Sequence, residues 1–264
     1  MYRTPAATAI AALAVAPIAS AAITDFNEWT LLEDPPTPGL NASVSPDGSS
    51  ATLTADAPPS INFSADVGYA SVNGNTVAES TQGFYFRATD SFKIAIDFAI
   101  EVGDSPTYEG GYGFGFGIGE DAAGDSSAGV AAFATAGPPP TTIGGPAGRA
   151  PGIGIILPQF PTFPAQEGSL IVDYNGTTGS INVGVAQTPG NNTPDQSSDI
   201  AIAQFWDGDD LLVSFFLRGG LESGDIDATF SNFRVVSGNP IEIPEPATAA
   251  LLAAGLGLIA TRRR

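Results

Sequence analysis

The chain has 264 residues and a formal net charge of −19, and it contains neither cysteine nor histidine. These absences exclude a disulfide framework, a Ser-His-Asp triad, a Cys-His pair and any metal site built on histidine or cysteine ligands. Between residues 23 and 243 only five basic residues accompany 27 acids. Such a surface repels nucleic acid and anionic lipid headgroups, so we expect neither as a partner, whereas it attracts cations.

The first 21 residues have the composition of a secretory signal peptide. Arg3 lies near the amino terminus, an alanine-rich apolar stretch follows, and Ala19-Ser20-Ala21 supplies the small residues of a cleavage site. The apolar residues are spread around the helix rather than gathered on one face, which favours a signal helix over a packed amphipathic helix. We predict that signal peptidase removes residues 1–21 and that the mature chain is exported.

Residues 22–243 read as one domain with the periodicity of β-strands. The most regular run is FKIAIDFAIEV at 92–102, in which large apolar residues alternate with polar residues and alanines. This alternation places Phe98 on the buried face and Asp97 on the opposite face. We therefore expect Phe98→Asp to be strongly destabilising and Asp97→Asn to be nearly silent.

A second run, GYGFGFGIG at 111–119, alternates large apolar residues with glycine. No helix follows that could offer its amino terminus to a phosphate, so these glycines do not predict a nucleotide site. They predict a strand with one bare face, which is either packed closely by another backbone or open to a ligand. We predict that this run and residues 92–102 form a hairpin.

Further strands are expected along the rest of the domain, at 52–56, 60–65, 83–89, 169–175, 180–187, 211–219 and 226–236. Asn175-Gly176-Thr177-Thr178-Gly179 is a strong hairpin signal between two of them. Residues 136–152, rich in proline and glycine, are expected to form a long loop. Short strands at turn-marked intervals, without helices, predict an all-β, two-sheet antiparallel sandwich or jelly roll.

Three acidic groups lie in turns and offer oxygen ligands for calcium. The group that we favour is Asp207, Asp209 and Asp210, because three carboxylates within four residues repel one another unless a cation lies between them. The other two groups are Glu120, Asp121 and Asp125, and Glu222, Asp225 and Asp227. The alternative interpretation is that all three are solvated loop charges. Calcium is the only cofactor that the sequence suggests.

The domain offers little for catalysis. A glycosidase needs two carboxyl groups within about 5 to 9.5 Å of each other. Asp97 and Glu101 are four residues apart on one strand, about 13 Å, and Asp225 and Asp227 are more typical of solvated or metal-bound groups. We predict no catalytic residues. Candidate sugar-contacting residues are Tyr85, Tyr108, Tyr112, Trp206 and Asn232, although Trp29 and Trp206 are equally compatible with the core.

The carboxyl-terminal 21 residues combine three features. Pro244-Glu245-Pro246 comes first, an apolar run of 14 residues at 247–260 follows, and Arg262, Arg263 and Arg264 end the chain. As a helix the apolar run is about 21 Å long, well short of the roughly 30 Å hydrocarbon core of a bilayer. Its basic end favours the cytoplasmic side. We expect the tail to insert transiently in the inner membrane.

This three-part order resembles the PEP-CTERM protein-sorting signal of Gram-negative bacteria. The resemblance implies export, recognition by an exosortase, and an association with exopolysaccharide and the cell surface or extracellular matrix. The alternative is a weak membrane helix that stays in place.

The domain itself resembles concanavalin A-like lectin and glucanase sandwiches, through DFNEW at 25–29 and DATFSNFRV at 227–235. That resemblance implies that the start of the domain pairs with its end. The Glu-x-Asp-x-x-Glu cluster of the hydrolases in that family is absent. We therefore expect a non-catalytic structural or polysaccharide-associated protein, with a lectin-like carbohydrate-binding module as the first alternative and a glycoside hydrolase as the second.

Overall fold

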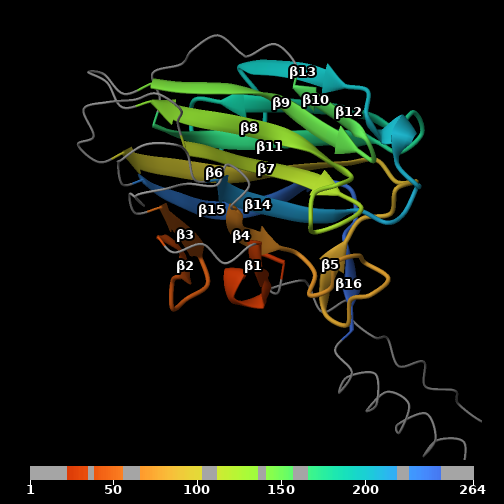
Figure 1. Cartoon of the computed structure of the whole chain (residues 1–264), viewed down its shortest axis with the longest axis horizontal. Coiled ribbons are helices and arrows are strands. Elements are labelled where there is room, and N and C mark those ends of the chain that lie inside the picture. The colour runs from red at the N-terminus through yellow and green to blue at the C-terminus, as the bar shows by residue number, and fades with distance from the viewer. Residues whose placement is uncertain are drawn as a thin grey trace, which may run out of the picture.

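A computed structural model of the chain describes residues 23–34, 39–55, 66–102, 112–135, 141–156, 166–218 and 226–244. The predicted signal helix and tail helix both lie outside these residues. The described part is a sandwich of antiparallel sheets (Figure 1), which confirms the predicted all-β architecture. Its helical elements are two short 3-10 turns, η1 (Phe26–Glu28) and η2 (Ala203–Phe205). Neither could cross a membrane, and no other helix occurs within these ranges.

Two seven-stranded sheets form the layers, and a two-stranded ribbon lies beside them. The first sheet has the order β1 (Thr30–Asp34), β4 (Asp66–Ala70), β14 (Leu212–Arg218), β7 (Tyr112–Gly119), β8 (Ser127–Thr135), β9 (Thr141–Ala150) and β10 (Ile153–Ile156). The second has the order β13 (Gln196–Ile200), β12 (Ser180–Ala186), β11 (Glu167–Asn175), β6 (Phe92–Val102), β15 (Ile226–Ser237), β3 (Ser50–Ala55) and β2 (Leu40–Val44). The ribbon pairs β16 (Ile241–Ile243) with β5 (Gly83–Tyr85).

The core fills the space between the two large sheets. The inward residues of β6 are buried as predicted: Phe92, Ile94, Ile96, Phe98 and Ile100. Aromatic rings meet across the interface, with the ring centroid of Phe98 5.2 Å from that of Phe114 and the centroid of Phe215 4.6 Å from that of Phe230. Trp29 is also a core residue and packs on Phe233.

The predicted hairpin between residues 92–102 and 111–119 is wrong. β6 lies in the second sheet between β11 and β15, and β7 lies in the first sheet between β14 and β8. The two runs carry matching rows of large apolar residues, and these rows pack face to face across the core instead of edge to edge. Because the runs lie in different sheets, the two rows face each other and each covers the apolar surface of the other, whereas in a hairpin both rows would face the same way and need a separate cover.

Two further expectations are wrong. The start of the domain does not pair with its end: DFNEW forms the turn η1, and β1, which follows it, pairs with β4. Residues 141–150, expected as loop, form strand β9 between β8 and β10. Glycine and proline have low β-propensity, so the composition of this segment predicted a loop. The hydrogen bonds to the neighbouring strands β8 and β10 make it a strand.

Other expectations hold. β11 and β12 form the predicted hairpin, and the Gly179 amide donates to the Asn175 carbonyl over 2.8 Å at its turn. The glycines of β7 are closely packed: a Cβ added at Gly117 would lie 2.5 Å from the Ala128 carbonyl oxygen, and at Gly115 it would meet the Phe216 ring. Of the two alternatives for this bare face, these contacts support close packing. The strand expected at 60–65 lies outside the described residues.

Candidate functional site: the outer face of the second sheet

The outer face of the second sheet carries rows of polar side chains across four neighbouring strands. Because side chains alternate along a strand, the registers place Glu101, Asp227 and Thr54 in one row, continued by Asn41. We call this surface the polar platform, and its residues are Asn41, Ser43, Thr52, Thr54, Glu101, Asp227, Thr229 and Ser231. All of them are exposed or half-buried. The alternating apolar residues of the same strands fill the core, which is why the sequence folds this way.

The platform is internally hydrogen-bonded. The Thr54 hydroxyl donates to the Asp227 carboxylate over 2.6 Å, and the hydroxyls of Thr52 and Thr229 are 3.1 Å apart. Glu101 and Asp227 stand directly opposite each other on β6 and β15. Like charges directly opposite each other are destabilising, and a hydrogen-bond donor or a cation between the two carboxylates would relieve that repulsion. The sequence did not predict that Glu101 and Asp227 are neighbours, because they lie on different strands and are 126 positions apart in the chain.

Two of the aromatic residues predicted as sugar contacts, Trp206 and Tyr85, lie away from the platform. Trp206 is half-buried against the core, and its indole N–H donates to the Arg149 carbonyl over 2.8 Å. Tyr85 is half-buried on β5. Tyr108 and the side chain of Tyr112 lie outside the described part of the chain. The platform residues themselves include no aromatic side chain, so any sugar contact there is made by hydrogen bonds rather than stacking.

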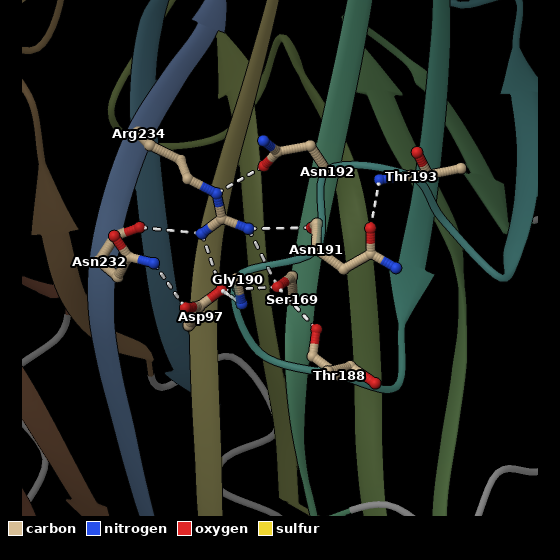
Figure 2. Close-up of polar contacts among 9 residues, drawn as sticks. All are labelled: Asp97, Ser169, Thr188, Gly190, Asn191, Asn192, Thr193, Asn232 and Arg234. Atoms are coloured by element: carbon tan, nitrogen blue, oxygen red, sulfur yellow. Dashed lines mark hydrogen bonds and ion pairs between the residues drawn. The ribbon is translucent and has the colours of Figure 1, made fainter.

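A buried polar cluster borders the platform, centred on Asp97 (Figure 2). The Asp97 carboxylate pairs with the Arg234 guanidinium over 2.7 Å and accepts from the Ser169 hydroxyl over 2.6 Å. It also accepts from the Asn232 side-chain amide over 2.7 Å and from the Gly190 backbone amide over 3.0 Å. Asp97 is only 6% exposed, so four donors replace the water that this carboxylate has lost.

A β-bulge in β15 brings Arg234 to this face. The pairing of β15 with β6 shifts between Ser231 and Arg234, and Asn232 has a φ of +48°, in the left-handed region. The extra residue lets Phe230 and Phe233 both point into the core, although they are three positions apart. That spacing was the signal in the sequence that a strict alternation ends here.

The cluster also binds the loop between β12 and β13, residues 187–195, which we call the capping loop. Arg234 donates to the Asn191 carbonyl over 2.9 Å and to the Asn192 side-chain oxygen over 2.6 Å. Pro194 lies against Gly184 of β12. A small second apolar cluster is buried on this half of the outer face, consisting of Ala95, Ile171 and Ala186. The outer face is therefore divided into a half covered by the capping loop and the platform, whose side chains are exposed or half-buried among the described residues.

These contacts contradict the expectation that neutralising Asp97 is nearly silent. Burial raises the pKa of Asp97, but the hydrogen bonds from Ser169, Asn232, Gly190 and Arg234 outweigh it, and the net effect is a pKa below the ordinary value. The alternation of β6 placed Asp97 on the correct face. The error arose because neither the capping loop nor the bulged Arg234 is visible in the local pattern.

The loop that carries the predicted calcium ligands is organised around Glu120. The backbone amides of Asp207, Gly208 and Asp209 donate to the Glu120 carboxylate over 3.0, 2.6 and 2.8 Å. Glu120 is buried, whereas Asp207 and Asp209 are exposed. The described ranges hold no group of three or more acidic side chains arranged to bind a metal, and Glu222 and Asp225 lie outside them. Calcium at Asp207, Asp209 and Asp210 stays a prediction.

Comparison with known proteins gives one sequence match. Residues 242–264 match the PEP-CTERM protein-sorting motif, which confirms the resemblance seen in the tail. No curated protein matches the chain.

Several solved structures are similar at low identity. A functionally unknown protein from Saccharomyces cerevisiae has 14% identity and a TM-score of 0.48, covering 82% of this chain and 100% of its own. Winged bean acidic lectin complexed with methyl-alpha-D-galactose has 13% identity and a TM-score of 0.34, covering 78% and 100%. Peanut lectin has 14% identity and a TM-score of 0.36, covering 80% and 100%. Similarity at this level carries no information on what this chain binds.

The chain thus carries a PEP-CTERM sorting motif behind a β-sandwich, and the motif implies export, sorting to the cell surface and processing by an exosortase.

Proposed function

We propose that this protein is a non-catalytic surface or matrix component of a Gram-negative bacterium that associates with exopolysaccharide through its polar platform. The sorting motif carries the export part of the proposal. Signal peptidase and exosortase act on the two ends, and the tail spends a transient stage in the inner membrane. The sandwich is the part that remains at the surface.

The platform supports the polysaccharide part. It presents hydroxyl, amide and carboxylate groups at the regular spacing of a sheet, about 4.8 Å between strands. A polysaccharide offers hydroxyl groups that both donate and accept, so it can pair with each of these groups along an extended face. Because the surface is strongly acidic, we expect a neutral polymer, or an acidic one bridged by divalent cations.

The test is co-sedimentation of the purified protein with exopolysaccharide from the native host. We expect Thr52→Val with Thr229→Val to weaken retention about tenfold, since each hydroxyl contributes about 0.5 to 1.5 kcal/mol in a typical hydrogen bond. Thr177→Val, at the exposed tip of the β11–β12 hairpin, is the matched control. Equal retention of the double variant and the control would remove the platform from the proposal.

The same preparation tests the alternatives. Selective retention of one glycan on an array would favour a lectin-like module over a structural matrix role. Among the described residues, the cross-strand pair of Glu101 and Asp227 is the observation that favours a hydrolase. Release of reducing ends from the polymer, abolished by Glu101→Gln, would replace the non-catalytic proposal with that one.

A further inference from the structure

The sorting motif begins inside the folded domain. The matched residues are 242–264, whereas β16 ends at Ile243. In the ribbon, Ile241 lies opposite Tyr85 and Ile243 opposite Gly83. The exposed residue Pro244 follows directly. No linker therefore separates the sandwich from the Pro-Glu-Pro segment.

The two strands of the ribbon differ in how firmly they are held. β5 belongs to the core: Phe84 is buried, its ring centroid lies 5.3 Å from that of Trp29, and its amide donates to the Ser71 carbonyl over 2.8 Å. β16 has only three residues, none of them buried. Figure 1 shows the ribbon set apart from the two large sheets. A pairing this short, with no buried side chain on one strand, opens at a small fraction of the global unfolding free energy.

Chain length limits how a membrane enzyme can reach the tail. With the apolar run 247–260 in the bilayer, only three residues join it to β16, a span of about 10 Å at 3.3 to 3.6 Å per residue. The headgroup layer on one side of the bilayer occupies roughly 5 to 7 Å of that span. The sandwich would then be pressed against the membrane, although its acidic surface is repelled by anionic headgroups. Little room is then left between the sandwich and the membrane for an enzyme to reach the segment at 244–246.

We propose that β16 detaches from β5 when the sorting enzyme engages the chain, so that the ribbon controls access to the tail. Detachment frees residues 238–243, and the tether grows from three residues to nine, about 30 Å. Gly238, at the start of the freed segment, has a φ of +93° and ends β15 with a sharp change of direction. The inference rests on the sorting function proposed above.

A disulfide across the ribbon tests the proposal. The chain has no cysteine, so Tyr85→Cys with Ile241→Cys introduces one bond only. Directly paired residues of antiparallel strands have Cα atoms about 4.5 to 5.5 Å apart, within the range that a disulfide spans. The bond forms after export, in an oxidising compartment. Each single substitution is a control for loss of the native side chain, and thiol titration reports whether the bond has formed.

The readout is the fraction of protein in the native host that has lost residues 251–264, measured by intact mass. We expect the double variant to be processed at least tenfold less than either single variant. Inserting six glycine and serine residues between Ile243 and Pro244 of the locked chain should restore processing, because it supplies the missing reach. Equal processing of locked and single variants, or no rescue by the insertion, overturns the inference alone. A wild-type chain that keeps its tail overturns the proposed sorting and this inference together.

Discussion

The Asp97 carboxylate and the Arg234 guanidinium lie 2.7 Å apart on the outer face of the second sheet, joining β6 to β15. Arg234 reaches the capping loop from the same position, through Asn191 and Asn192. One ion pair thus links the middle of the sheet to the loop residues Asn191 and Asn192, which are 43 and 42 positions from Arg234 in sequence. Because both side chains are largely buried, the pair behaves differently from the charged contacts at the surface.

Asp97→Asn should destabilise the fold by on the order of 3 kcal/mol, because it leaves the Arg234 guanidinium buried without a counter-charge. Asp173→Asn is the matched control: Asp173 lies 3.6 Å from Lys93 between β11 and β6, and its side chain is half exposed. Exposed pairs of this kind contribute about 0 to 1 kcal/mol. Chemical denaturation of both variants is the measurement. Equal losses would show that burial of the Asp97 pair has no energetic consequence.

The same carboxyl predicts a loss of stability in acid. Since the pKa of Asp97 is lower in the folded protein than in the unfolded chain, its contribution is present above about pH 4 and is lost as pH falls through the folded value. The unfolding free energy of Asp97→Asn should fall less steeply below pH 4 than that of the wild type.

A second carboxyl, that of Asp47, also contributes to the loss of stability below about pH 4, so its effect has to be measured separately. Hydrogen bonds from Ser45 and Ser49 lower the pKa of Asp47 to about 2 in an exposed turn. The acid profile of Asp47→Asn should be recorded beside that of Asp97→Asn. Parallel profiles for the wild type and Asp97→Asn would contradict the assignment to Asp97.

Gly117→Ala should destabilise the first sheet by about 1 to 3 kcal/mol, because the new methyl group would press on the backbone of β8 at Ala128. Ala99→Ser, at an exposed position of β6, is a surface control expected to stay within about 0.5 kcal/mol. Thermal melts compare the two. An unchanged melting temperature for Gly117→Ala would reopen the alternative that the glycine face is available to a ligand.

Glu120→Gln should loosen the loop at 207–209. The amide offers one acceptor oxygen in place of two and turns a donor group toward the backbone N–H groups, so we expect a loss of about 2 kcal/mol. Asp125→Asn changes an exposed carboxylate nearby and should have little effect. Hydrogen exchange at the amides of Asp207 and Asp209 gives the local readout. Unchanged protection in Glu120→Gln would show that the carboxylate does not organise this loop.

Calcium should raise the melting temperature if Asp207, Asp209 and Asp210 bind it, since a ligand that binds only the folded state stabilises it. The comparison is a melt in millimolar calcium against chelator at fixed ionic strength, repeated with Asp209→Asn. A shift that disappears in the variant supports the site. No shift in the wild type would remove the calcium prediction, and a shift that survives the substitution would move the site elsewhere.

Local patterns in the sequence determined the properties that depend on neighbouring residues. The alternation of residues 92–102 assigned Phe98 to the core and Asp97 to the outer face, and Asn175 to Gly179 specified a hairpin, because side-chain direction and turn geometry are set within a few residues. The sorting signal is also a linear motif, read as consecutive residues, so composition and order were sufficient to recognise it.

Tertiary structure alone decided which strands are neighbours and which polar groups are buried. Phe98 and Phe114 face each other from different sheets, and Asp227 lies beside Glu101 although 126 positions separate them. The same applies to Asp97, which is buried only because a bulge aims Arg234 at it and a loop covers both. The pairing of distant strands is the one that leaves the least apolar area in water over the whole domain. That total area depends on all the strands together, so a short stretch of sequence does not determine it.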